Sequence, residues 1–184
     1  MSAGDGSEPI TPDETLFRRI PASQPDWYNP QRDPPVSPFA FNPTKEDTTG
    51  LSLTRRKHTT VEKAGAGRPG KSYFVAFLRA GALDSKGIVV IPKPEDDNRG
   101  HAEIPAMTYS TRKSPDVEAA KIALSELVYF VDGPFPRPPG AEPPREPAQP
   151  AIATPQQDAE VPATSKGGRG CLLLVLVIVV LIAM

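Results

Sequence analysis

The chain has 184 residues, which is enough for one domain of ordinary size but not comfortably for two. Its formal net charge is −1, so no overall positive field attracts it to nucleic acid, and no nucleic-acid partner is expected. One cysteine cannot form an internal disulfide, which agrees with a reducing compartment. Of the 24 prolines, nine precede Lys45 and ten lie from Pro134 to Pro162, so they bracket a middle section that can fold.

This proline distribution divides the chain into four parts. Residues 1–14 are polar and are predicted to be disordered. Residues 15–133 are predicted to form a small α+β cytoplasmic domain, because about 120 residues can enclose one hydrophobic core. Residues 134–166 are rich in Pro, Ala, Glu and Gln and are predicted to be an extended, disordered linker. Residues 167–184 are predicted to anchor the chain in a membrane.

Three short apolar runs of the middle section indicate strands. Residues 48–53, TTGLSL, predict a turn at Gly50 followed by a short strand. The run SYFVAFLRA at residues 72–80 is rich in aromatic and β-branched side chains and predicts a buried strand, although its length also permits a helix. Residues 88–91 predict a strand that Pro92 stops.

Two further segments complete the predicted fold. Residues 101–107, HAEIPAM, indicate another short strand, which Pro105 places near an edge of the sheet. One helix begins at Ser114, a favourable N-cap, with Pro115 in its first position, and Gly133 followed by proline is predicted to end it. Its apolar stripe comprises Val117, Ala120, Leu124, Leu127 and Val128. The predicted fold class is α+β, with a small mixed or antiparallel sheet and one main amphipathic helix.

A match to the P-loop pattern occurs at residues 65–72, GAGRPGKS. The motif residues are Gly65, Gly70, Lys71 and Ser72. A working P-loop follows a buried strand and opens a helix whose backbone N–H groups hold phosphate. Here the preceding residues are polar and the following ones favour a strand, and Pro69 removes one N–H donor. The match is therefore interpreted as a false positive, and no binding of ATP or GTP is expected.

Six basic side chains are candidates for binding an anion: Arg18, Arg19, Arg55, Arg56, His58 and His101. The alternative is that they belong to solvated faces. His101 and Glu103 alternate along a strand and share one face, so this pair could perform acid–base chemistry. No catalytic residue is assigned, and two histidines do not support a metal site. No cofactor is expected.

The run CLLLVLVIVVLIAM at residues 171–184 is the only long uninterrupted apolar stretch. As a helix it covers about 21 Å, and about 27 Å with the preceding glycines, which approaches the roughly 30 Å of a bilayer core. Lys166 and Arg169 precede the run and no charge follows it, which predicts a single-pass tail anchor with the N-terminal domain on the cytoplasmic side. Cys171 falls at the predicted interface and is a candidate for S-acylation.

Several short motifs resemble those of a known group of sequences. LFRRI at residues 16–20, GLSL at 50–53 and HAEI at 101–104 resemble a set of small uncharacterised bacterial proteins that share an LYRRI opening, a GLSV motif and an HA-x-I motif. The resemblance covers residues 16–104. It implies a compact single domain and carries no known activity.

These features predict a membrane-tethered cytoplasmic interaction module without enzymatic activity, with an unidentified protein as its partner. The alternative is an enzyme or binder that acts on a nucleotide or another phosphate-bearing ligand. A common pocket containing Arg18, Arg56, His58 and His101 would favour the alternative, whereas dispersed side chains favour the interaction module.

Overall fold

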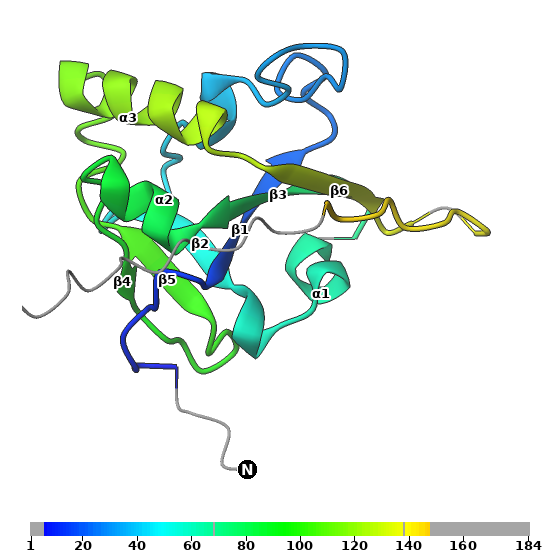
Figure 1. Cartoon of the computed structure of the whole chain (residues 1–184), viewed down its shortest axis with the longest axis horizontal. Helices are drawn as coiled ribbons and strands as arrows, with labels where there is room; N and C mark the ends of the chain where they lie inside the picture. Colours follow the sequence, from blue (N-terminus) through cyan, green and yellow to red (C-terminus); the bar gives the residue numbers. More distant parts are fainter. Residues whose placement is uncertain (1–5, 68, 138, 148–184) are drawn as a thin grey trace, which may run out of the picture. The chain divides into compact units, whose positions relative to one another are not determined.

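The computed structural model describes residues 6–67, 69–137 and 139–147. In these residues six strands form one antiparallel sheet in the order β4-β5-β2-β1-β3-β6 (Figure 1). The strands are β1 Thr15–Pro21, β2 Leu51–Arg55, β3 Tyr73–Arg79, β4 Ile91–Pro92, β5 His101–Ile104 and β6 Phe130–Phe135. The α+β prediction is confirmed, and of the two predicted sheet types the antiparallel one is present.

Short helices connect and cover these strands. They are η1 Pro38–Phe41, η2 Arg56–His58, α1 Val61–Gly65, α2 Ala80–Ser85 and α3 Pro115–Glu126. Val117 and Leu124 of α3 belong to the larger apolar cluster, whereas Val61 of α1 packs against a smaller, aromatic one. The two clusters are built on opposite faces of the sheet, so α3 covers one face and α1 covers the other.

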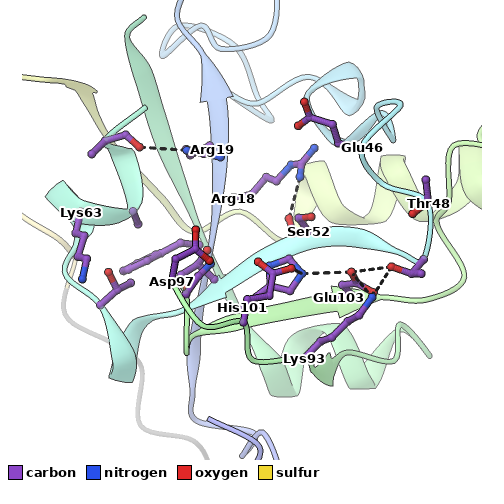
Figure 2. Close-up of a pocket in the computed structure, with 18 residues that line it drawn as sticks. Arg18, Arg19, Glu46, Thr48, Ser52, Lys63, Lys93, Asp97, His101 and Glu103 are labelled. Carbon is purple, nitrogen blue, oxygen red and sulfur yellow. Dashed lines mark hydrogen bonds and ion pairs between the residues drawn. The ribbon is translucent and has the colours of Figure 1, made fainter. Parts of the chain in front are cut away.

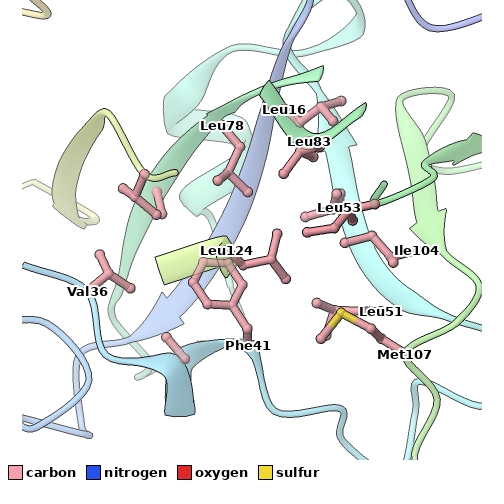
Figure 3. Packing of buried hydrophobic residues seen from close by; sticks show 14 of the residues in the cluster. Leu16, Val36, Phe41, Leu51, Leu53, Leu78, Leu83, Ile104, Met107 and Leu124 are labelled. Carbon is pink, nitrogen blue, oxygen red and sulfur yellow. The ribbon is translucent and has the colours of Figure 1, made fainter. Parts of the chain in front are cut away.

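Alternation along β1 distributes its apolar side chains between these two clusters. Leu16 and Ile20 belong to the larger cluster, and Phe17 belongs to the smaller one. Leu16 pairs with Leu78 of β3 and Phe17 pairs with Phe77, so both faces continue across the strands. Figure 3 shows the larger cluster, which includes Leu16, Val36, Phe41, Leu51, Leu53, Leu78, Leu83, Ile104, Met107 and Leu124. Burying each large side chain contributes about 1.5–3 kcal/mol.

The start of α3 agrees with the sequence prediction, but its end does not. The Ser114 hydroxyl accepts a hydrogen bond from the Val117 N–H, as an N-cap does. The helix ends at Glu126, and Gly133 lies inside β6 instead of terminating the helix. Gly133 has φ +123°, and a Cβ there would lie 2.9 Å from the backbone carbonyl oxygen of Tyr73 on β3. The glycine therefore permits close strand pairing, a role that sequence analysis mistook for a helix stop.

Strand β6 also crosses the predicted boundary between domain and linker at residue 134. Phe135 is 2% exposed, pairs with Tyr73 of β3 and belongs to the smaller cluster together with Val75 and Phe77. Burial of this aromatic ring outweighs the proline-rich context from which the linker was predicted. The sheet therefore includes residues 134 and 135.

The other predicted strands are present with altered lengths. The strand predicted for residues 72–80 is β3, and the one after Gly50 is β2. Of the strand predicted for residues 88–91, only Ile91 lies in a strand, β4, and Pro92 belongs to β4 instead of stopping it. A proline is tolerated there because β4 lies at the sheet edge. The strand β5 lies beside β4 and ends at Ile104, one residue before the proline.

Residues 1–14 are predicted from the sequence to be disordered. In the structure residues 6, 8, 9 and 14 form hydrogen bonds with Arg55, as described below. Residues 148–184 lie outside the described part of the chain, and with them most of the predicted linker, Cys171 and the predicted anchor. No helix in the described ranges is long and apolar enough to cross a bilayer.

Candidate functional site

A polar cavity of about 690 Å³ opens where β1 and β2 separate (Figure 2). The two strands pair only at Leu16 with Arg55 and at Phe17 with Thr54. Beyond these two pairs, β1 is paired with β3 only, and β2 is paired with β5 only. Ligand pockets commonly measure about 300–1,000 Å³. The lining includes Phe17, Arg18, Arg19, Glu46, Thr48, Thr49, Ser52, Thr54, Thr59, Lys63, Ala64, Ala66, Lys93, Glu95, Asp97, Asn98, His101 and Glu103.

The strand register explains why polar side chains gather on this face. Ser52 of β2 pairs with Glu103 of β5, and Thr54 pairs with His101. All four line the cavity. Their neighbours along β2 and β5, such as Leu53, point to the larger apolar cluster because successive side chains alternate between faces. The prediction that His101 and Glu103 share a face is confirmed.

Glu103 forms a closed ionic network at one end of the cavity. Its Oε1 accepts hydrogen bonds from Thr49 (2.9 Å) and Lys93 (3.0 Å) and lies 3.2 Å from His101 Nε2. Burial alone would raise the pKa of Glu103, but these hydrogen bonds and the Lys93 charge outweigh it, so the pKa lies below the ordinary value. A carboxylate with a low pKa and occupied lone pairs is a weak general base. This network therefore provides little support for acid–base catalysis.

Arg18 lies in the gap between β1 and β2 and has few partners. Its Nη1 donates to the Ser52 carbonyl oxygen at 2.8 Å, while its Nε is buried without a hydrogen-bond partner. Burial lowers the pKa of Arg18, and the nearby Asp47 carboxylate opposes that shift. The Asp47 oxygens accept from Thr44 and from the Ser52 N–H. No ion pair within 4.0 Å joins Arg18 to any carboxylate in the described ranges.

Two further cations line the cavity without a carboxylate partner among the described residues. Arg19 Nη1 donates to the Ala66 carbonyl oxygen at 3.1 Å, and its guanidinium lies 5.3 Å from the Tyr73 ring centroid. Lys63 extends from α1. Arg19 and Lys63 line the cavity together with Arg18, whereas Lys93 is already paired with Glu103. Sequence analysis missed Lys63 and Ser52, because their placement depends on how the strands and α1 pack.

Arg55, a candidate for anion binding, has a structural role instead. It is fully buried, and its Nε and Nη2 donate to the two Glu14 carboxylate oxygens at 2.6 Å and 3.0 Å. Its Nη1 donates to the carbonyl oxygens of Gly6 and Glu8 at 2.8 Å and 2.9 Å. The protein itself therefore supplies the anion and the acceptors that Arg55 needs, and residues 6–14 wrap around this guanidinium.

Arg56 and His58 also lie beside carboxylates, away from the cavity. Arg56 forms an ion pair with Glu146 at 2.8 Å, and His58 Nε2 lies 3.0 Å from a Glu8 carboxylate oxygen without forming a hydrogen bond. Lys57 donates to the same Glu8 at 2.9 Å and lowers the Glu8 pKa to about 2. Of the six candidate residues, the cavity brings together Arg18, Arg19 and His101 only.

The P-loop-like segment lacks the local structure of a phosphate cradle. Ser72 is followed by the strand β3, whereas the motif requires a helix at this point. Gly65 closes the short helix α1, and a Cβ there would clash with the Phe135 ring. Gly65 is therefore explained by close packing. Lys71 is exposed.

No group of three or more His, Cys, Asp or Glu side chains in the described ranges could hold a metal ion. No protein family, curated protein or solved structure matches this chain. The resemblance to small bacterial proteins therefore stays a prediction.

Proposed function

We propose that this protein is a non-enzymatic interaction module held at the inner face of a membrane. The observation that carries the proposal is that both histidines lie beside carboxylates of the protein itself and that two of the four candidate arginines, Arg55 and Arg56, are ion-paired. His58 lies against Glu8 and His101 against Glu103, while Arg55 is saturated by Glu14 and backbone oxygens. An enzyme needs a base or nucleophile free to reach a substrate, and both histidines are nearly buried beside carboxylates.

The sequence of residues 167–184 supports the membrane tether. The run from Cys171 onward is uncharged, and Lys166 and Arg169 precede it, which favours a cytoplasmic domain on the N-terminal side. The proline-rich residues before Lys166 would act as a spacer between domain and bilayer. Acylation of Cys171 would add a second hydrophobic attachment.

Exposed apolar side chains on the domain support a protein partner. Phe39 on η1 is 60% exposed and Ile122 on α3 is 51% exposed, and these two elements pack against each other. Aromatic and aliphatic side chains are the common anchors of protein interfaces. The face formed by η1 and α3 is therefore where a protein partner would bind.

Flotation with phosphatidylcholine vesicles tests the tether. The full-length protein should float with the vesicles and resist a high-salt wash, whereas the chain ending at Lys166 should remain in the soluble fraction. Salt-resistant flotation of the shortened chain would refute an anchor in residues 167–184.

Cross-linking in membranes from producing cells tests the interaction face. A defined cross-linked partner should be lost in the double variant Phe39→Ser, Ile122→Ser and retained in the control Val89→Ser, since Val89 is also exposed, at 62%, but lies beside β4. Loss of the partner in both variants, or in neither, would contradict the proposed face.

One observation favours part of the alternative, a binder of a phosphate-bearing ligand. Arg18 lines a cavity with most of its hydrogen-bonding capacity unused. The enzymatic part has less support because the lone pairs of Glu103 are occupied.

A further inference from the structure

We propose that the cavity between β1 and β2 binds a phosphate monoester carried on a small hydroxylated compound, with Arg18 as the principal phosphate ligand. This inference goes beyond the interaction module and does not depend on the membrane anchor. It concerns binding only and requires no chemical step.

The comparison of Arg18 with Arg55 is the main argument. Both guanidinium groups have five N–H donors. Arg55 donates to both Glu14 oxygens and to backbone oxygens of residues 6, 8 and 9, so every side of it is satisfied. Arg18 makes a single hydrogen bond, to Ser52, and forms no ion pair with a described residue. Arg18 is half-buried, and its Nε is buried without a partner. A buried N–H of a charged group is costly without an acceptor, and an anion in the cavity would supply one.

The hydroxyl groups near Arg18 indicate what else the ligand carries. Thr48, Ser52 and Thr54 line the cavity, and their side-chain oxygens have no hydrogen-bond partner among the described residues. Figure 2 shows Ser52 and Thr48 on the same side of β1 as the Arg18 guanidinium. Hydroxyls both donate and accept, so they suit the hydroxyl groups of a polyol or sugar next to the phosphate.

The carboxylates of the cavity limit the charge of the ligand. Glu46, Glu95 and Asp97 face it, and Glu103 does so with its charge offset by Lys93. Glu46 already takes part in an interaction of its own. These carboxylates would repel a triphosphate, whereas one phosphate at Arg18 can be accommodated because Arg19 and Lys63 also line the wall. The geometry therefore favours a monoester and agrees with the expected lack of ATP binding.

Glycerol 1-phosphate contains the proposed chemistry in soluble form, and the headgroup of phosphatidylinositol 4-phosphate carries a phosphate monoester on a hydroxylated ring in a lipid. The Nε–H resonances of the arginines in the full-length protein can be followed by NMR. In a non-ionic detergent, glycerol 1-phosphate is titrated as the soluble probe. In a second arm, nanodiscs of phosphatidylcholine alone are compared with nanodiscs of phosphatidylcholine that contain phosphatidylinositol 4-phosphate.

A saturable shift of the Arg18 Nε–H signal is expected in at least one arm, with no change at Arg55. A shift in the soluble arm identifies a metabolite, and one confined to the nanodiscs that contain phosphatidylinositol 4-phosphate identifies a headgroup. The absence of a saturable Arg18 shift in both arms overturns the proposal, and this readout needs no variant.

Variants give a second, independent check by titration calorimetry with the same probe. Arg18→Gln should weaken binding about tenfold to a hundredfold, because hydrogen bonds to charged groups contribute about 1.5–3 kcal/mol. The control Arg112→Gln removes the same charge outside the cavity and should change affinity by about twofold or less, as expected for a screened surface charge. Equal weakening by both substitutions would show that the probe senses only net charge and would overturn the assignment of Arg18.

Discussion

Replacing Glu14 by Gln should lower the free energy of unfolding by about 3 kcal/mol, because Arg55 would remain buried without a bonded carboxylate. Arg55 is fully buried and Glu14 is 7% exposed, so water screens neither partner effectively. Burial alone would raise the Glu14 pKa, but hydrogen bonds and charge from Arg55 and Lys57 outweigh it, and the pKa is lowered. Glu14 is therefore ionised in the native protein at neutral pH.

The expected size of this loss follows from the contacts around the Arg55 guanidinium. Breaking a buried ion pair by removing one partner costs about 3–5 kcal/mol. Glutamine retains one oxygen that can accept from Arg55, and the Glu8 carboxylate lies 3.9 Å from Arg55 Nη2. Both features reduce the penalty toward the lower end of that range. Because Lys57, at 3.4 Å from Glu14, also loses a partner, the penalty should not disappear.

Urea unfolding of the full-length protein in a non-ionic detergent measures this effect. Trp27 is the only tryptophan and packs against the larger apolar cluster, so its fluorescence reports loss of tertiary structure. The midpoint should fall with an unchanged denaturant slope, and the melting temperature should fall by about 6–12 °C. The control Arg56→Gln breaks the more exposed pair with Glu146 and should cost about 1 kcal/mol or less. An equally small loss for Glu14→Gln would refute the buried-pair argument.

Three other outcomes are expected. The pKa of Glu8 is lowered from 4.5 to about 2, and a carboxylate with a lowered pKa stabilises the native state above its ordinary pKa. The stability of the protein should therefore fall as the pH drops from 4.5 toward about 2 and Glu8 becomes protonated. A melting temperature that does not change with pH, measured by circular dichroism, would contradict this. Phe41→Ala should cost about 3–5 kcal/mol in urea unfolding because the ring is fully buried, and a loss typical of surface sites would disprove its core position. Gly133→Ala should cost about 1–3 kcal/mol, because φ is +123° and the new Cβ would crowd Tyr73; unchanged stability would show that β6 does not pair this closely with β3.

The elements predicted well from sequence are those whose signals are local. The run containing β3 combines aromatic and β-branched residues over seven positions, and its burial on both faces follows from that composition. The start of α3 is fixed by Ser114 and the proline after it, which act within one turn. These signals are independent of the rest of the fold.

The strand β6 could not be predicted in this way. Its sequence, FVDGPF, contains the glycine and proline that normally end an element. It forms because Phe130 pairs with Phe77 and Phe135 enters the aromatic cluster, and both contacts are remote in sequence. Tertiary packing here outweighs local propensity, so the predicted domain boundary falls too early.

The cavity was predictable only in part, for a similar reason. Alternation alone places His101 and Glu103 on one face of a strand. Bringing Ser52 beside Glu103 requires the register between β2 and β5, and exposing Arg18 to a cavity requires that β1 and β2 separate after two pairs. Neither the register between β2 and β5 nor the separation of β1 from β2 can be read from the sequence of a single strand.

The arginines show why composition could not distinguish structure from function. Arg18 and Arg55 each stand first in a pair of adjacent arginines near the end of an apolar run. Their difference lies in the number of acceptors that the folded chain brings to each. Residues 6–14 bring a carboxylate and backbone oxygens to Arg55, whereas the opening between β1 and β2 leaves Arg18 with one carbonyl. The same residue type therefore holds the terminus in one place and remains available to an external anion in the other.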